Sequence, residues 1–332
     1  MKAKDLSEIY LQSIEARGVR EVTLVKYEWE LARFLVDFGS RDIESITFSE
    51  LMGWLRNLRQ CDGKRYAHAS LAGVSKGIRY FFKFALRKGY IQTNVAADLP
   101  RYNQKPVKRL AAPEEDVIKI LNSLDGFIEQ RGRALRDLRD ALIVSFAIST
   151  GARLRTITEL ERDAVTRALE NPIAIYAPGN VSYVYHVSAE GKGDKMLELR
   201  FSQSTADLFT EYLARTRHIV SPMVFLTDNH LTKPVSPYSI SKAFERVCEF
   251  AGTRTWLSHS IRKANVMAIL DNGGDLKTAA GYAQHSDTSI TLQHYVYGSA
   301  KRIDMAAASM DQRRQEEAQI MREMNALFKK SR

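Results

Sequence analysis

Apolar side chains recur at helical spacing through the first hundred residues. The positions form two stripes: Leu24, Tyr27, Leu31, Phe34 and Leu35 in the first, and Leu71, Val74, Ile78, Phe81 and Ala85 in the second. Apolar residues three or four apart fall on one face of an α-helix, which can then pack against other helices. Thr47 and Glu50 have the spacing of a capping box at the start of a further helix. The pattern predicts a small helical bundle.

The periodicity is lost between residues 100 and 113, where basic residues surround Pro106. Such a stretch is typical of a linker, so we expect a domain boundary near residue 110. Helical patterns follow at about 113–124 and 135–150, and helices resume after Ser202. Between them, residues 173–176, 183–187 and 196–200 alternate apolar and polar positions, as β-strands do. We therefore predict a mostly α-helical protein with a small β-sheet in its second domain.

Positive charge is concentrated in one part of the chain. The 332 residues carry a formal net charge of +10, and residues 61–112 hold eleven Lys or Arg against only Asp62 and Asp98. Such a block is often only a solvated surface. Here the cations recur at helical spacing among aromatic residues, so one face of the helix can pack while the other meets phosphates. This favours a nucleic acid over a membrane as partner. The predicted DNA-binding residues are Arg79, Lys83, Arg87, Lys88, Lys105 and Lys108.

The cysteines and the hydrophobic runs argue against a structural zinc site, a secreted protein and a membrane-spanning protein. Cys61 and Cys248 are far apart, and no CxxC or His/Cys cluster has the spacing of a zinc site. The N-terminus has no apolar core of a signal peptide, and no apolar run approaches the length of a membrane span. We expect a cytoplasmic protein that uses no metal or other cofactor.

Six residues in the C-terminal half have side chains suited to cutting a phosphodiester without a metal ion. In chain order they are Arg153, Lys192, His259, Arg262, His285 and Tyr295. Arg153 follows Thr150-Gly151 at the end of an apolar helical run, and Lys192 lies in a Gly-Lys-Gly turn between strands. His259 and Arg262 are three apart, so they project from one helical face, and Ser258 is the expected N-cap.

Each of these residues has a simpler interpretation when it is taken alone. An HxxR pair is frequent by chance, and a lysine in a tight turn usually only adds solubility. The chain has 14 tyrosines, most of which must be core or surface residues. The order and spacing of the six favour the functional interpretation. Lys195 remains an alternative to Lys192, and Tyr297 an alternative to Tyr295, whereas Tyr282 is not placed to compete.

These segments together resemble the tyrosine recombinase (phage integrase) family, over nearly the whole chain. The resemblance implies a helical, SAM-like core-binding domain over residues 1–105, a basic linker over 106–112 and an α+β catalytic domain over 113–298. The two domains are expected to close as a C-shaped clamp around duplex DNA. Residues 299–332 are expected to form a tail helix, with an apolar stripe that packs on its own domain or on a neighbouring protomer.

The family also implies a role for each of the six residues. Tyr295 attacks the scissile phosphate and forms a 3′-phosphotyrosyl intermediate. Arg153 and Arg262 hold the phosphate oxygens, and His285 donates a hydrogen bond to them. His259 accepts the tyrosine proton or hydrogen-bonds the phosphate, and Lys192 protonates the departing 5′ oxygen. Four protomers on two duplexes, a homotetramer, exchange strands without ATP, with accessory DNA-bending proteins as further partners.

Some positions depart from the family pattern. Thr156 stands where a glutamate is common, Lys263 where a histidine is common, and Ala283-Gln284 where Leu-Gly is common; Arg155 adds a charge beside Arg153. Three functions therefore compete. The first is a strand-exchange recombinase, either a mobile-element integrase or an Xer-like resolvase. The second is a nicking and closing enzyme like the type IB topoisomerases, and the third is a DNA-binding protein with a relic active site.

Overall fold

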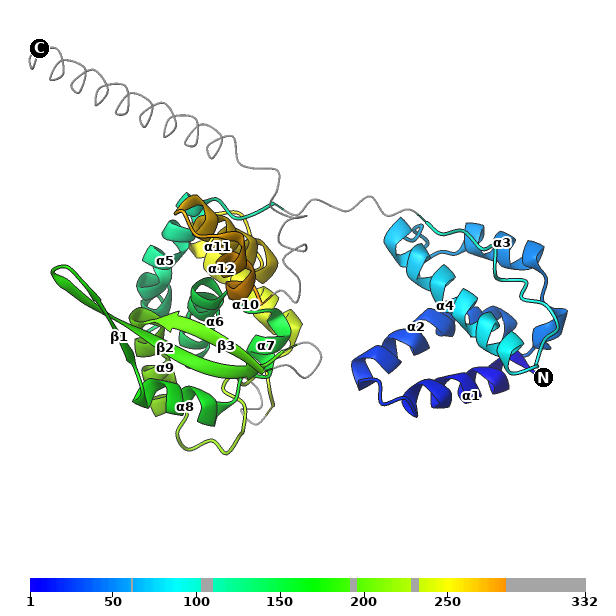
Figure 1. Cartoon of the computed structure of the whole chain (residues 1–332), viewed down its shortest axis with the longest axis horizontal. Helices are drawn as coiled ribbons and strands as arrows, with labels where there is room; N and C mark the ends of the chain where they lie inside the picture. The colour runs from blue at the N-terminus through cyan, green and yellow to red at the C-terminus, as the bar shows by residue number, and fades with distance from the viewer. Residues whose placement is uncertain (61, 103–109, 192–195, 228–232, 285–332) are drawn as a thin grey trace, which may run out of the picture. The chain divides into compact units, whose positions relative to one another are not determined.

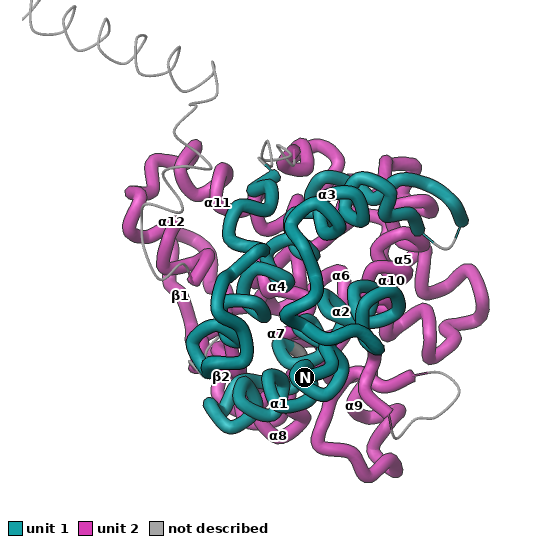
Figure 2. The backbone as a smooth tube through the Cα atoms, turned by 90° about the vertical axis from the view of Figure 1, so that its right-hand side faces the viewer, with its two compact units in different colours: residues 1–108 teal, residues 109–332 magenta. Residues whose placement is uncertain are grey.

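The chain folds into two compact units. The computed structural model describes the whole chain apart from residues 61, 103–109, 192–195, 228–232 and 285–332. Unit 1 comprises Met1–Lys108 and unit 2 Arg109–Arg332 (Figure 2), and each has its own hydrophobic core. Lys105, Lys108 and the predicted tail lie outside the described residues. None of the described helices has the length and apolar character needed to cross a membrane.

Unit 1 is a helical bundle. Its elements are α1 (Ala3–Glu15), α2 (Glu21–Phe38), the 3₁₀ helix η1 (Ile43–Ser45), α3 (Phe48–Asn57) and α4 (His68–Arg87). The two predicted apolar stripes lie on α2 and α4, where Phe34, Phe81 and Phe82 are fully buried. The ring centroid of Phe34 lies 6.0 Å from those of Phe81 and Phe82, so aromatic packing joins the two helices.

The predicted capping box at the start of α3 is confirmed. The Glu50 backbone N–H donates to Thr47 Oγ1 at 3.3 Å, and the Thr47 N–H donates to the Glu50 carboxylate at 2.9 Å. Each side chain thus satisfies a backbone donor that the first turn of the helix leaves without an intrahelical acceptor. Helix α3 therefore begins where the sequence predicts it.

Unit 2 surrounds one central helix, α6. The elements are α5 (Glu114–Glu129), α6 (Leu135–Thr150), α7 (Leu154–Thr158), α8 (Arg162–Glu170), β1 (Ile173–Ala177), β2 (Asn180–Glu190), β3 (Met196–Ser202), α9 (Gln203–Arg215), α10 (Pro237–Phe250), α11 (Ser258–Asp271) and α12 (Leu276–Tyr282). Every residue from Asp137 to Ile148 is buried, and Figure 1 shows α6 within a shell of helices. The predicted fold class, mostly α with a small sheet, is confirmed.

The three strands form one antiparallel sheet in the order β1-β2-β3. Its buried face rests on α6 and α9 through aromatic contacts. The ring of Phe201 lies 5.9 Å from that of Phe146 and 5.3 Å from that of Phe209. The β1–β2 hairpin continues beyond this contact as far as the pair Ala177 and Asn180 and projects from the unit in Figure 1.

Helix α5 is longer than the sequence pattern predicts. The pattern ends it near residue 124, and Gly126, a poor helix former, follows two residues later. In the structure the helix continues to Glu129. Phe127 and Ile128 account for the difference, since both are buried, at 2% and 1% exposure. Tertiary packing of two large side chains outweighs the cost of one glycine.

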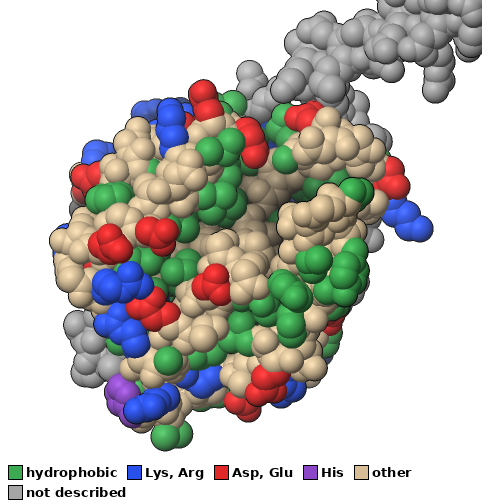
Figure 3. All heavy atoms as spheres, turned by 90° about the vertical axis from the view of Figure 1, so that its left-hand side faces the viewer, with side chains coloured by type: hydrophobic (Ala, Val, Ile, Leu, Met, Phe, Trp, Pro, Cys, Tyr) green, Lys and Arg blue, Asp and Glu red, His purple; other side chains and the backbone are tan. Residues whose placement is uncertain are grey.

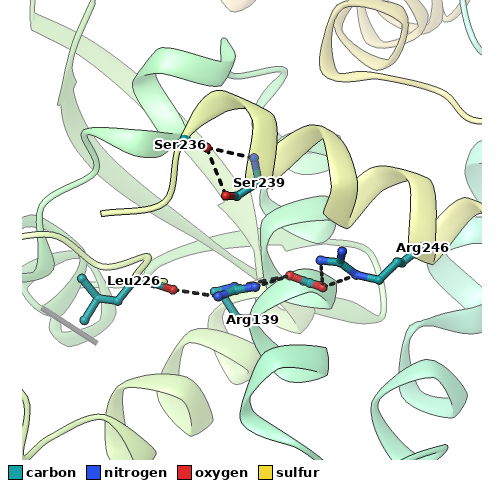
Figure 4. A network of polar contacts seen from close by, with 6 residues as sticks. Arg139, Leu226, Ser236, Ser239 and Arg246 are labelled. Atoms are coloured by element: carbon teal, nitrogen blue, oxygen red, sulfur yellow. Dashed lines mark hydrogen bonds and ion pairs between the residues drawn. The ribbon is translucent and has the colours of Figure 1, made fainter. Parts of the chain in front are cut away.

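A buried carboxylate fastens α10 to α6. Asp140 is fully buried, and its Oδ1 accepts a hydrogen bond from Arg139 at 2.9 Å while its Oδ2 accepts one from Arg246 of α10 at 2.8 Å. Arg139 also donates to the Leu226 carbonyl at 2.8 Å, and Figure 4 shows the chain of contacts beneath the first turn of α10. A buried charge requires such partners, so this network fixes the position of α10.

Candidate active site

The chain leaves α6 through a tight turn that sets the position of Arg153. Gly151 has φ 60°, the left-handed conformation that ends many helices, and its N–H donates to the Ala147 carbonyl at 2.9 Å. Thr150 Oγ1 accepts a hydrogen bond from the Ala152 N–H at 3.1 Å. Arg153 comes next, in extended conformation, as the residue before α7. The helix end thereby delivers the arginine to a defined place.

Side chains of the segment 258–282 hold this turn by its backbone. Four carbonyls at the end of α6 and in the turn accept a hydrogen bond: Ile148 from Asn265 Nδ2 at 2.6 Å, Ser149 from the Tyr282 hydroxyl at 2.5 Å, Gly151 from Arg262 at 2.7 Å, and Ala152 from Ser258 Oγ at 2.8 Å. The last carbonyls of a helix have no intrahelical donor and need such partners when buried. The bonds tie α11 and α12 to the turn.

Arg153 and Arg262 are thereby brought to one turn of the chain. Arg262 is 5% exposed, and its guanidinium binds the carbonyl of Gly151, two residues before Arg153. Arg153 itself is half-buried, and desolvation lowers the pKa of its guanidinium. His259 is exposed in the first turn of α11, three residues before Arg262. Two cations and an imidazole on adjoining elements suit the binding of a tetrahedral anion such as phosphate.

Ser258 does not have the predicted role of an N-cap. Helix α11 begins at Ser258 itself, and Leu257 occupies the cap position in extended conformation. The Ser258 hydroxyl donates to the Ala152 carbonyl instead of accepting a bond from the first turn of its helix. The prediction was wrong because a local cap and a long-range contact compete for the same hydroxyl. The long-range contact satisfies a buried carbonyl that would otherwise lack a donor.

Thr156 and Arg155, two of the departures from the family pattern, face different surroundings. Thr156 is buried, at 3% exposure. The exposed Arg155 donates to the carboxylate of Glu159 at 2.7 Å, one turn further along. This ion pair offsets the extra charge of Arg155 beside Arg153.

Lys192 and its alternative Lys195 lie outside the described residues. The strands on either side are described: Glu190 at the end of β2 pairs with Met196 at the start of β3. Gly191 is packed closely, since a Cβ there would lie 2.5 Å from a methyl carbon of Leu197. The two lysines therefore belong to the connection between β2 and β3, as the sequence pattern predicts.

His285, Tyr295 and Tyr297 also lie outside the described residues, which end at Gln284 in this part of the chain. Of the six predicted catalytic residues, the structure thus places Arg153, His259 and Arg262. It brings these three together around the end of α6. The assignments of Lys192, His285 and Tyr295 stay predictions.

Sequence reasoning missed Asn265 and Tyr282. The Tyr282 hydroxyl donates to the Ser149 carbonyl and accepts from Asn265 Nδ2 at 3.0 Å, and burial raises the pKa of this hydroxyl to about 12. The hydroxyl proton and one oxygen lone pair are therefore engaged in holding the turn, which does not suit Tyr282 to the role of nucleophile. The spacing carries a signal for Asn265, which follows Arg262 by the same three residues that separate His259 from Arg262.

We expect Tyr282→Phe to destabilise unit 2 by about 1–3 kcal/mol, because the buried Ser149 carbonyl loses its donor. Urea denaturation of the full chain measures the change. Tyr238 is 71% exposed on α10, so Tyr238→Phe is the matched control and should be neutral. Equal midpoints for Tyr282→Phe and the wild-type chain would show that the hydroxyl does not hold the turn.

A basic face runs along α4 of unit 1. Lys83, Arg87 and Lys88 are exposed, as expected for DNA-binding residues, whereas Arg79 is half-buried. The structure adds Lys76, whose ammonium lies 5.5 Å from the centre of the Tyr80 ring. A cavity of about 240 Å³ beside this face is lined by cations and aromatic rings: Tyr10, Ile14, Arg17, Tyr27, Tyr80, Lys83, Phe84 and Arg87. Such a mixture suits a polyanion with stacking groups.

The described part of the chain contains no group of three or more His, Cys, Asp or Glu side chains placed to hold a metal ion. The site around the end of α6 instead offers cationic and hydrogen-bonding groups. Its chemistry is therefore that of binding and stabilising negative charge on oxygen.

Residues 114–302 match the sequence profile of the phage integrase family. The chain is also similar to the tyrosine recombinase XerD of Corynebacterium glutamicum, with 27% identity over 315 residues that cover 90% of this chain and 95% of XerD.

Two solved structures share the fold. One is the XerH site-specific recombinase bound to a palindromic difH substrate, with a TM-score of 0.64 and 18% identity over 92% of this chain and 85% of that one. The other is a lambda integrase tetramer bound to a Holliday junction, with a TM-score of 0.61 and 17% identity over 89% of this chain and 77% of that one.

Proposed function

We propose, from the premise that this chain belongs to the phage integrase family, that it cuts and rejoins strands of duplex DNA through a 3′-phosphotyrosyl intermediate. The chain is a tyrosine-type site-specific recombinase. The observation that supports the chemistry is the turn after α6, where Arg262 binds the Gly151 carbonyl and Arg153 follows two residues later. Two guanidinium groups held on one turn can neutralise a phosphate whose charge increases in the transition state.

In the proposed reaction, the Tyr295 hydroxyl oxygen attacks phosphorus and the bond from phosphorus to the 5′ oxygen breaks. His259 accepts the proton of the tyrosine, and Lys192 supplies the proton that the 5′ oxygen needs to leave. The phosphate remains attached to Tyr295, so the energy of the broken bond is conserved. A 5′ hydroxyl from a partner strand then reverses these steps and releases the tyrosine.

The proposed substrate is duplex DNA, held by both units as a C-shaped clamp. The basic face of α4 would meet phosphates from unit 1, and the end of α6 would meet the scissile phosphate from unit 2. Strand exchange needs a cut in each of four strands, so we propose a homotetramer on two paired sites. The lambda integrase structure, a tetramer bound to a Holliday junction, supports this arrangement.

Between the two biological outcomes, we propose Xer-type recombination first, because the similarity to XerD extends over 95% of that protein. Integration of a mobile element is the second candidate, supported by the lambda integrase fold. The two outcomes differ in their substrates. A resolvase recombines two identical sites on one circular DNA, and an integrase joins two different sites. Two plasmids, one with two identical selected sites and one with two different sites, therefore distinguish a resolvase from an integrase.

The test of the chemistry is a nicked suicide duplex that carries a site selected by the full chain from random DNA. A cut near the nick releases a short fragment, so the intermediate cannot reverse and the protein stays covalently bound. We expect an adduct that survives denaturation and disappears with protease. A relic protein would form none. An enzyme of the topoisomerase type would form the adduct and also relax supercoiled plasmid as a monomer.

The basic face of α4 is expected to set the salt dependence of DNA binding. Each phosphate contact releases condensed counterions, so the double variant Lys83→Ala, Arg87→Ala should reduce the slope of log K against log salt by about 2. Binding titrations across a range of salt concentrations measure the slope. Lys4 and Arg56, two other exposed cations of unit 1, provide the control. If the double variant Lys4→Ala, Arg56→Ala reduced the slope equally, the basic face of α4 would have no special role in DNA binding.

A further inference from the structure

The β1–β2 hairpin of unit 2 changes character along its length. Near its base the residues alternate: Tyr185, Val187 and Ala189 are buried on one face, at 7% exposure or less. The polar residues His186, Ser188 and Glu190 point to the other face. This alternation is what a sheet needs when one face packs and the other meets water. The base of the hairpin is therefore an ordinary half-buried sheet.

Toward the tip the alternation is lost, and both faces become apolar. Residues directly opposite one another share a face, and the register pairs Tyr176 with Val181 and Ile173 with Val184. On the face continuous with the core, Tyr176 is 81% exposed and Tyr183 45%. On the other face Ile175 is 50% exposed. No described residue covers either face of the tip, although its pattern is that of a strand pair buried on both sides.

The hairpin is also the longest stretch of the chain without charge. No Asp, Glu, Lys or Arg occurs between Glu170 and Glu190. Among the described residues another long uncharged run, 141–152, is almost entirely buried in α6 and its turn, which accounts for its composition. Figure 3, drawn from the side toward which the hairpin projects, shows hydrophobic side chains gathered over part of that face, with charged side chains of both signs beside them. A surface without cations in a chain of net charge +10 is not shaped by contact with a polyanion.

We infer that β1 is an interface between two copies of this chain. Among the described strands β1 is an edge strand, so one side of its backbone has hydrogen-bonding groups that no described strand of the same copy satisfies. If the β1 strands of two copies paired antiparallel about a twofold axis, each strand would satisfy the free hydrogen-bonding groups of the other. Ile175 of one copy would lie beside Ile175 of the other, and the two apolar tips would cover one another.

A second copy can meet this surface at little electrostatic cost. Two chains of net charge +10 repel one another, and contact is least costly where neither carries a cation. The inference rests on the proposed function in one respect, since strand exchange gathers several copies on paired DNA sites. Pairing through β1 would then join copies within that assembly.

Ile175→Glu tests the pairing, because a twofold contact would place two like charges side by side. We expect sedimentation velocity of the full chain to show association weakened by roughly tenfold or more. Val220 is 96% exposed after α9, so Val220→Glu brings the same charge elsewhere and should leave association unchanged. Unchanged association of Ile175→Glu would overturn the pairing. So would a loss of DNA binding by Ile175→Glu at concentrations where the chain is monomeric, since the hairpin would then contact DNA.

Mixing two variants with opposite charges at position 175 shows whether the partner is a second copy. It also controls for a folding defect in either variant. Ile175→Glu and Ile175→Lys should each associate poorly alone, and an equal mixture of the two should associate again, because opposite charges then meet across the axis. Failure of the mixture to associate would overturn pairing between copies. Adduct formation on the suicide duplex is measured in parallel. An adduct without β1 pairing would leave the proposed function intact, and β1 pairing without any adduct would remove only the proposed function.

Discussion

Replacing Tyr295 by phenylalanine is expected to abolish covalent attachment of the chain to DNA and leave DNA binding nearly unchanged. The substitution removes only the proposed nucleophilic oxygen, whereas the proposed phosphate contacts of the α4 cations and of the turn after α6 stay the same. Phenylalanine offers no oxygen for the attack, so the loss should reach the detection limit. Denaturing gels of the suicide duplex measure the adduct, and gel-shift titration measures binding.

Two other tyrosines make this prediction specific. Tyr297→Phe should form the adduct as the wild-type chain does. Tyr282→Phe should retain some adduct at temperatures where the chain is folded, because the Tyr282 hydroxyl is bound to the Ser149 carbonyl and has a pKa raised to about 12. An adduct formed by Tyr295→Phe and lost in Tyr297→Phe would assign the nucleophile to Tyr297 instead.

Arg262→Ala is expected to reduce strand cleavage by about 10²–10³-fold, the usual effect of removing one group that stabilises transition-state charge. It should also lower the free energy of unfolding by about 1–3 kcal/mol, because the buried Gly151 carbonyl loses its donor. Single-turnover cleavage of the suicide duplex measures the first effect, and urea denaturation measures the second.

Arg153→Ala separates the two effects of Arg262→Ala. Arg153 is half-buried, and the turn around it is held by donors from α11 and α12. We therefore expect Arg153→Ala to lose cleavage to a similar degree with a smaller loss of stability. Full cleavage by either variant would take that arginine out of the active site. Equal destabilisation by both variants would mean that Arg153 also supports the fold.

The secondary structure of both units was accessible from the sequence where its signals are local. The capping box of α3, the helix that ends at Thr150-Gly151 and the three strands rest on side chains within a few residues of one another. The spacing of His259 and Arg262 likewise requires only that the segment be helical. Such patterns predict element type and which residues share a face.

The contacts that assemble the site were not accessible in this way. The bond from Ser258 to Ala152 joins residues 106 apart, and that from Tyr282 to Ser149 joins residues 133 apart. A hydroxyl or an amide in a sequence does not reveal which distant carbonyl it will satisfy, because the choice depends on tertiary packing. The error at Ser258 and the omission of Asn265 and Tyr282 have this common origin.

The turn after α6 also bears on which sequence changes the protein can accumulate. All four acceptors in the turn are backbone carbonyls, and a carbonyl is the same whatever side chain its residue carries. Positions 148 and 152 can therefore drift during evolution among residues that suit the core, whereas the Ser149 hydroxyl has its own contact with Thr205 Oγ1 at 2.9 Å. Gly151 is constrained by its φ of 60° and by the Tyr282 ring, which would lie 3.2 Å from an added Cβ. Selection to keep the turn in place should thus fall mainly on the four donors.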